Sequence, residues 1–202
     1  MTRKMKTFCK RIVAAASAAV LTLGGVLPGL GTAVIKADTQ PTLWIVGDST
    51  VSDFNDSYYI PRKGYGTQIG VYLDGTYTIQ NLAQSGTSSK SYLAQSNYEV
   101  LKSGIKAGDA LIVGFGHNDE KYDDSSRYTS PFGTKETEGS FAKSLYDNYV
   151  KLAQDKGAEV ILCTPVVRRT SNDTFSDQQL QTRCLYNAVS ISLASSLACK
   201  SA

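Results

Sequence analysis

Three short polar motifs in this chain carry the residue types that acyl transfer requires. Gly47-Asp48-Ser49 supplies a hydroxyl, Gly86 supplies a backbone N–H with no Cβ beside it, and Asn118 supplies a side-chain amide. A hydroxyl can attack an ester carbonyl, and N–H donors can stabilise the oxyanion that forms. Each motif alone is typical of an ordinary turn or helix cap. Their joint meaning depends on whether the fold brings them together.

The motifs follow three of the four segments that the hydrophobic pattern predicts as strands. These strands are expected at residues 43–46, 77–82, 110–115 and 160–163. The first, third and fourth are continuous apolar runs, which is typical of strands buried on both faces of a parallel sheet. Ligands of open α/β sheets bind beyond the carboxyl ends of the strands. We therefore expect the three motifs to line one site.

Helices are predicted between the strands, at residues 66–73, 91–103 and 140–156, with Gly157 as the C-terminal cap of the last. Alternating strands and helices predict an α/β fold: a three-layer α/β/α sandwich with a mostly parallel, flavodoxin-like sheet. Residues 119–139 are polar and rich in Asp, Ser and Tyr. They predict one long surface loop, of the kind that often carries function.

The motifs resemble the first three sequence blocks of the SGNH (GDSL-type) hydrolases, and most closely those of the rhamnogalacturonan acetylesterase-like branch. The quoted stretches are Gly47-Asp48-Ser49-Thr50, Asn81-Leu82-Ala83-Gln84-Ser85-Gly86, Gly116-His117-Asn118-Asp119 and Thr164-Pro165, within roughly residues 42–180. The resemblance implies Ser49 as the nucleophile and an oxyanion hole made by the N–H groups of Ser49 and Gly86 and the side chain of Asn118. It implies no metal and no organic cofactor. The implied reaction is removal of acetyl groups from plant cell-wall polysaccharide, either pectic rhamnogalacturonan or xylan.

The last block of that family, an Asp-x-x-His that supplies the catalytic His and its orienting Asp, is not found in this sequence. The one His is His117, and adjacent residues leaving a strand point in different directions, so His117 is expected to fix its loop rather than act as the base. Three explanations stay open: a truncated or frame-disrupted esterase, an inactive relative that binds carbohydrate without turnover, and a base from another chain. The first predicts an atypical tail over residues 181–202, a sheet incomplete at the C-terminus and no closing helix.

The first 37 residues have the layout of a secretory signal peptide, with the remaining domain at 38–202. A basic head precedes an uncharged apolar run from Ile12 to Leu27, which is shorter than the roughly 20 residues that span a bilayer. Ala33 or Ala37 offers a small residue for cleavage. We expect a secreted protein with no stable membrane association after cleavage; an uncleaved N-terminal anchor is the alternative.

Charge and composition exclude several other classes. The net charge is +3, but six of the 21 basic residues and none of the 18 acidic residues lie in residues 1–37, so the rest of the chain carries −3. No nucleic-acid partner is expected from such a surface, and the expected partner is an acetylated polysaccharide or a small ester. The 42% of hydrophobic residues exclude a disordered polar chain. Three Cys follow residue 37 and allow at most one disulfide, while the oligomeric state does not follow from the sequence.

Two groups of charged residues have more than one interpretation. The acidic residues of the 119–139 loop lack the spacing of a calcium loop and are expected to be solvated. Arg168 and Arg169 follow the fourth strand. They either pair with uronic-acid carboxylates or form a solvated pair.

Overall fold

The computed structural model describes residues 40–54, 61–166, 186–191 and 193. The predicted signal peptide (1–37), Arg168, Arg169, Cys184, Cys199 and most of the tail from residue 181 lie outside these residues. The described strands form one sheet in the order β2-β1-β3-β4. Their bounds are β1 (Thr42–Gly47), β2 (Thr78–Asn81), β3 (Ala110–Gly114) and β4 (Glu159–Leu162).

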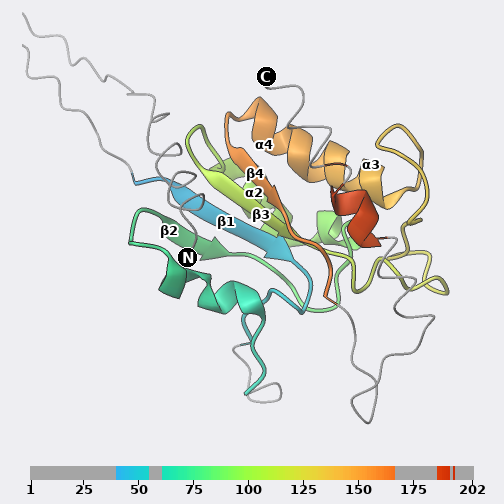
Figure 1. Ribbon diagram of the computed structural model, residues 1–202, viewed down its shortest axis with the longest axis horizontal. Coiled ribbons are helices and arrows are strands. Elements are labelled where there is room, and N and C mark those ends of the chain that lie inside the picture. Colours follow the sequence, from blue (N-terminus) through green and yellow to red (C-terminus); the bar gives the residue numbers. More distant parts are fainter. Residues whose placement is uncertain (1–39, 55–60, 167–185, 192, 194–202) are drawn as a thin grey trace, which may run out of the picture.

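All three strand pairs are parallel, as the apolar runs predict. Thr42 of β1 lies opposite Thr78 of β2, Leu43 opposite Ala110 of β3, and Ala110 opposite Glu159 of β4. This order is the one found in flavodoxin-like sheets. All four strands therefore end at one edge, where the polar motifs begin (Figure 1).

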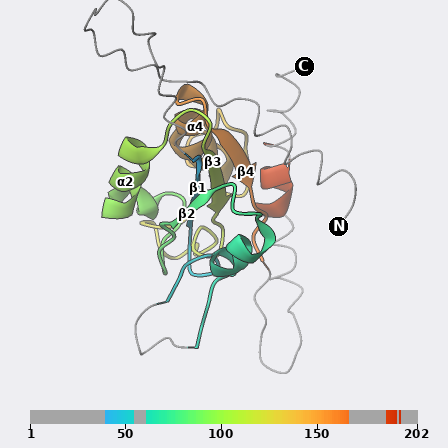
Figure 2. The same cartoon turned by 90° about the vertical axis from the view of Figure 1, so that its left-hand side faces the viewer.

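Helices cover both faces of the sheet (Figures 1 and 2). The 3₁₀ helix η2 packs against one face, while α2 and the α3-η4-α4 helix pack against the other. Their bounds are η2 (Tyr65–Tyr72), η3 (Ser91–Ala94), α2 (Ser96–Gly104), α3 (Phe141–Leu145), η4 (Tyr146–Val150) and α4 (Lys151–Asp155). The predicted three-layer α/β/α arrangement is confirmed.

The predicted helix over 140–156 is a single run with a π turn, η4, in its middle. The Ser140 side chain accepts a hydrogen bond from the Lys143 N–H at its start, as an N-cap does. Gly157 has a φ of 73° just past its end, which is the expected left-handed C-terminal cap. The predicted C-terminal cap at Gly157 is thus confirmed.

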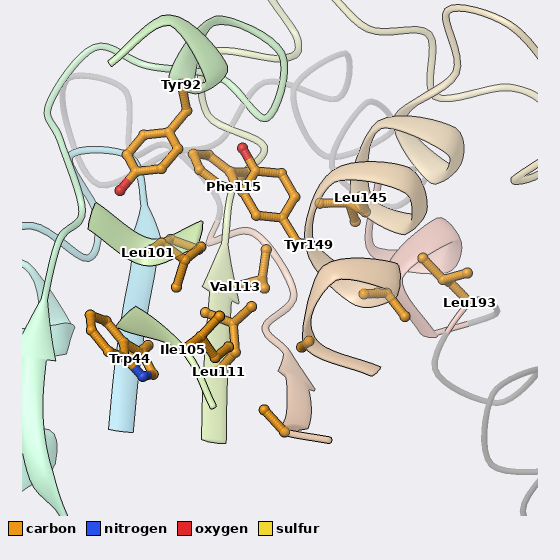
Figure 3. Close-up of a cluster of buried hydrophobic side chains, with 14 of the residues drawn as sticks. Trp44, Tyr92, Leu101, Ile105, Leu111, Val113, Phe115, Leu145, Tyr149 and Leu193 are labelled. Carbon is orange, nitrogen blue, oxygen red and sulfur yellow. The ribbon is translucent and has the colours of Figure 1, made fainter. Parts of the chain in front are cut away.

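Three aromatic rings, those of Tyr92, Phe115 and Tyr149, lie together in the larger of the two hydrophobic core clusters (Figure 3). The ring of Phe115, the residue after β3, lies 5.4 Å from that of Tyr92 and 5.2 Å from that of Tyr149, measured between centroids. The Tyr92 hydroxyl donates to the Leu82 carbonyl (2.8 Å), and the Tyr149 hydroxyl donates to the Ser89 carbonyl (2.7 Å). The core therefore holds the loop after β2 at two points.

Strand β4 is not buried on both faces, so that prediction is wrong. Val160, Ile161 and Leu162 are only partly buried, whereas every residue of β3 is buried. Within the described residues, β4 pairs with β3 alone and forms the edge of the sheet. An apolar run therefore does not by itself distinguish a central strand from an edge strand.

The expectation that no helix follows residue 180 is also wrong. Residues 186–191 and 193 are helical, and Tyr186 and Leu193 belong to the larger core cluster. The Tyr186 ring meets Phe141 of α3 edge to face at 4.9 Å. The buried residues are seven positions apart, which places them on one face of a helix. The expected absence of a fifth strand concerns residues outside the described ones.

Candidate active site

Ser49 lies in the turn directly after β1 and is half-buried. The buried Asp48 organises this turn: its Oδ1 accepts hydrogen bonds from the N–H (2.9 Å) and the hydroxyl (2.7 Å) of Thr50. The N–H groups of Val51 and Ser52 both donate to the Asp48 carbonyl at 3.1 Å. The turn around the Ser49 hydroxyl is therefore held on both sides.

Two glycines let the ends of β1 and β3 approach closely. A Cβ on Gly47 would lie 2.4 Å from the Gly114 carbonyl oxygen, and a Cβ on Gly114 would lie 2.6 Å from Val51 Cγ2. The Asp48 N–H donates to the Gly114 carbonyl at 3.2 Å. Gly47 has no room for a side chain, because its neighbour is backbone and cannot move aside, and at Gly114 a Cβ would also lie 2.5 Å from the Tyr65 hydroxyl. The first and third motifs consequently start side by side.

The loop after β2 is tied to the Ser49 turn. The Asn81 side chain donates to the Val51 carbonyl (3.0 Å) and accepts from the Ala83 N–H (3.1 Å). The Gln84 N–H donates to the Gly47 carbonyl (2.9 Å). Residue-by-residue reasoning gave Asn81 no function of its own. The feature of the sequence that could have identified Asn81 is its position as the first residue of the second sequence block.

Gly86 lies at the open side of this loop. Its φ is 82°, a backbone conformation that glycine adopts without strain, and a Cβ there would meet nothing within 4 Å. The next residue, Thr87, is buried, and its hydroxyl donates to the Gln84 carbonyl at 2.8 Å. The loop is thus anchored beneath Gly86, while Gly86 itself is exposed to solvent.

Asn118 joins the third motif to the second. Its side chain is buried, and its Nδ2 donates to the Thr87 carbonyl at 2.8 Å. A carboxamide nitrogen carries two hydrogens, so this bond fixes the amide plane and leaves a second N–H for another acceptor. The His117 backbone N–H donates to Asp48 Oδ2 at 3.0 Å. The segments that hold Ser49, Gly86 and Asn118 are therefore linked pairwise at one edge of the sheet.

The His117 ring contacts the segment after β4. Its Nε2 lies 2.9 Å from the Val166 carbonyl oxygen. Because a carbonyl only accepts, this nitrogen carries the hydrogen and Nδ1 is unprotonated in the neutral ring. The contact agrees with the predicted role of His117 in fixing its loop.

Asp119 is fully buried, so the prediction of a solvated acidic loop is wrong for its first member. Its carboxylate accepts from the Ser89 N–H (3.1 Å to Oδ2), the Ser89 hydroxyl (2.5 Å) and the Thr129 hydroxyl (2.9 Å). The pKa of Asp119 is raised to about 6: burial is the main cause and the nearby charge of Asp48 adds to the rise, while the hydrogen bonds from Ser89 and Thr129 oppose it. Sequence reasoning missed this residue because its neighbours are polar.

No group of three or more His, Cys, Asp or Glu residues within the described ranges could hold a metal ion. In the same part of the chain, no helix is both long and apolar enough to cross a membrane.

The profile described as GDSL-like Lipase/Acylhydrolase matches residues 43–198, which include all three motifs. The chain belongs to this family. The match also extends over the helical residues 186–191 and 193. The predicted resemblance is thereby confirmed.

The curated relatives include two proteins of Bacillus subtilis (strain 168). The chain is 32% identical over 126 residues to the probable rhamnogalacturonan acetylesterase YesY, covering 62% of this chain and 54% of YesY. It is 30% identical over 127 residues to the rhamnogalacturonan acetylesterase RhgT, covering 63% of this chain and 50% of RhgT. The chain thus spans about half the length of these relatives.

Among solved structures, the crystal structure of the YxiM protein from Bacillus subtilis is similar to this chain. The two superpose with a TM-score of 0.60 at 25% sequence identity, over 78% of this chain and 42% of that one. This likeness supports the α/β fold described above.

Proposed function

We propose that this chain is a secreted serine esterase that removes acetyl groups from pectic polysaccharide of the rhamnogalacturonan type. The observation that carries the proposal is the hydrogen bond from Asn118 to the Thr87 carbonyl, because it holds a carboxamide beside Gly86. The family membership and the names of the relatives YesY and RhgT support the reaction and the substrate class.

In the proposed reaction, the Ser49 hydroxyl oxygen attacks the acetyl carbonyl carbon and gives up its proton, which the leaving sugar oxygen takes up when the intermediate collapses. The N–H groups of Ser49 and Gly86 and the Nδ2–H of Asn118 donate to the oxyanion. Collapse of this intermediate breaks the ester bond, and the sugar oxygen leaves with a proton as a hydroxyl. Water then hydrolyses the acetyl-Ser49 ester to acetate and free serine. Removing one oxyanion donor costs about 3–4 kcal/mol of transition-state stabilisation.

A second candidate function is carbohydrate binding without turnover. One observation favours it: the single His of the sequence, His117, uses its Nε2–H to contact the Val166 carbonyl. A serine hydroxyl without a base is a poor nucleophile at neutral pH. The two functions differ in one measurable property, which is the release of acetate.

The test is acetate release from acetylated rhamnogalacturonan by the purified chain, with acetylated xylan and a small aryl acetate for comparison. We expect acetate from the pectic substrate, and its loss in Ser49→Ala. Ser103→Ala is the matched control, because Ser103 lies on α2 and its hydroxyl donates only to local helix carbonyls. Sugar binding that Ser49→Ala leaves intact, with no acetate from the unmodified chain, would instead support the binding function.

Secretion belongs to the same proposal and has its own test. Expression of the full chain in a bacterium that exports proteins should yield a shortened protein in the medium. N-terminal sequencing should place the cut after Ala33 or Ala37. A full-length protein retained in the membrane fraction would support the uncleaved anchor.

A further inference from the structure

We propose that Asp119 is a positioning residue of the oxyanion hole, which holds the loop of Gly86 in register with Asn118. The inference rests on the proposed function for its catalytic consequence. The attachment of the Gly86 loop by Asp119 is a separate, structural claim. It can be tested by a measurement that does not depend on ester hydrolysis.

Two adjacent residues bind two nearly adjacent positions of the same loop. Asn118 donates to the Thr87 carbonyl (2.8 Å), and the next residue, Asp119, accepts from the N–H and the hydroxyl of Ser89. The Gln84 N–H fixes the loop before Gly86 by its bond to the Gly47 carbonyl, and Asn118 and Asp119 fix it after Gly86 at Thr87 and Ser89. The Gly86 N–H therefore keeps one direction relative to the Asn118 amide.

The Asp119 attachment is itself braced by rigid elements. The Ser89 hydroxyl is 2.7 Å from that of Ser144 on α3, and the Ser89 carbonyl accepts from Tyr149 of η4. The backbone of Asp119 is held as well, because its carbonyl accepts from the Thr129 N–H (3.1 Å) and the Tyr186 hydroxyl (2.9 Å). Reacting groups are held most accurately when the residues behind them are locked by packing and hydrogen bonds.

The chemistry of this position requires a carboxylate. Three donors converge on the Asp119 oxygens: the Ser89 N–H, the Ser89 hydroxyl and the Thr129 hydroxyl. All three donors reach Oδ1, and the Ser89 N–H, 3.2 Å from Oδ1, also lies 3.1 Å from Oδ2. In an asparagine, an NH₂ group at the Oδ2 position would place a second donor 3.1 Å from the Ser89 nitrogen, and the opposite orientation would leave the two hydroxyls without their acceptor. Asp119→Asn is therefore a near-isosteric change that weakens the attachment.

The first experiment measures kcat and KM of Asp119→Asn on a small aryl acetate, with Asp123→Asn as the control at an exposed acid of the same loop. We expect kcat to fall about 10- to 100-fold with KM changed less than about twofold, the range seen when outer-shell partners of a site are removed. A purely structural role would reduce the amount of folded protein without this separation. An unchanged kcat in folded Asp119→Asn would overturn the proposal.

A second pair of variants keeps the proposal testable if Asp119→Asn does not fold. Thr129→Val removes one donor to the carboxylate, and Thr129→Ser restores it. We expect Thr129→Val to lower kcat by about three- to tenfold, and the Ser variant to recover it. Equal activity of the two variants would contradict the proposal.

Amide hydrogen exchange separates this inference from the proposed function. In Asp119→Asn or Thr129→Val, exchange at residues 86–89 should rise at least about tenfold, while β1 and β3 stay protected. If the unmodified chain releases no acetate but exchange rises as expected, the esterase proposal fails and the loop attachment stands. If exchange at residues 86–89 is unchanged, the attachment is overturned.

Discussion

Buried carboxylates lie at both ends of the sheet, and they are held in different ways. At the amino end, Asp109 accepts from the Thr42 N–H (2.8 Å) and the Trp44 indole N–H (2.9 Å) and forms an ion pair with Lys106 at 3.2 Å. At the carboxyl end, the donors to Asp119 within the described residues are one amide and two hydroxyls, none of them charged. The first acid fastens the start of two strands, and the second fastens the loops of the site.

The comparison indicates that the carboxylate at the amino end mainly stabilises the fold, whereas the one at the carboxyl end mainly positions the loops of the site. Asp119, held only by neutral donors, keeps a desolvation cost in its charged form. Such a cost is expected where a fold positions chemistry rather than maximising stability. The two ends should therefore respond differently to substitution.

The largest effect on stability is expected for Asp109→Ala. The change removes the acceptor of the Thr42 and Trp44 N–H groups inside the protein. Each buried donor left without a partner costs roughly 1–3 kcal/mol, so the free energy of unfolding should fall by about 3 kcal/mol in urea titrations. The kcat of the folded variant should be unchanged. Loss of turnover at full stability would contradict the division between the ends.

The second largest effect should be the change in the free energy of unfolding with pH that the ionisation of Asp119 causes. Burial raises the pKa of Asp119 from 3.8 to about 6, so between these values the folded state binds a proton that the unfolded state has lost. Stability from this group is complete below the unfolded value and is lost as pH rises through about 6, by roughly 3 kcal/mol at most. Urea unfolding between about pH 4.5 and pH 7.5 measures it. The other titratable groups that act on this site are Asp48 and Tyr149.

Asp119→Asn is the control for this slope, which it should abolish. Asp124 and Glu136, whose pKa values hydrogen bonds lower to about 2, act in the opposite sense. Their contributions are lost as pH falls below roughly 4.5, outside the measured range. A slope that persists unchanged in Asp119→Asn would assign it to another group.

Two glycines with similar backbone conformations, one at each end of the sheet, allow the same comparison with smaller expected effects. Gly86 at the carboxyl end and Gly108 at the amino end have φ values of 82° and 86°, and a Cβ on either would meet nothing within 4 Å. Alanine in this backbone conformation costs about 1–2 kcal/mol, so Gly86→Ala and Gly108→Ala should lose similar stability in thermal unfolding. Only Gly86→Ala should also lower kcat/KM, by roughly tenfold, because the Gly86 N–H is a proposed oxyanion donor. Equal kcat/KM values in the two variants would remove Gly86 from the site.

The smallest effect is expected at the rim of the site. The Arg127 guanidinium pairs with Asp124 (2.5 Å) and lies 3.3 Å from the Gly86 carbonyl. Partly exposed ion pairs contribute little, so Arg127→Gln should change the free energy of unfolding by less than about 1 kcal/mol. We expect a two- to threefold decrease of kcat/KM, roughly what a weak contact to the Gly86 loop supplies. A larger decrease for anionic than for neutral esters would show that Arg127 also contacts substrate.

Sequence reasoning predicted the strands and their parallel arrangement because apolar runs and the polar turns that follow them are local signals. It placed Ser49, Gly86 and Asn118 after consecutive strands for the same reason. The closing helical residues 186–191 and 193 were missed although five of the eight positions from 186 to 193 are hydrophobic, because the absence of an Asp-x-x-His block led the whole tail to be interpreted as atypical. The burial of Asp119 was missed because it depends on Ser89 and Thr129, which only the tertiary fold brings together.

The indole of Trp44 has a practical consequence. It is the chain's single tryptophan, it is almost fully buried, and it donates to Asp109 at the amino end. Its fluorescence therefore reports on the strand origins alone, and titration with an oligosaccharide at the opposite edge should leave the emission maximum in place. A tryptophan introduced at Tyr128, next to Arg127, would provide a second optical reporter for occupancy of the rim.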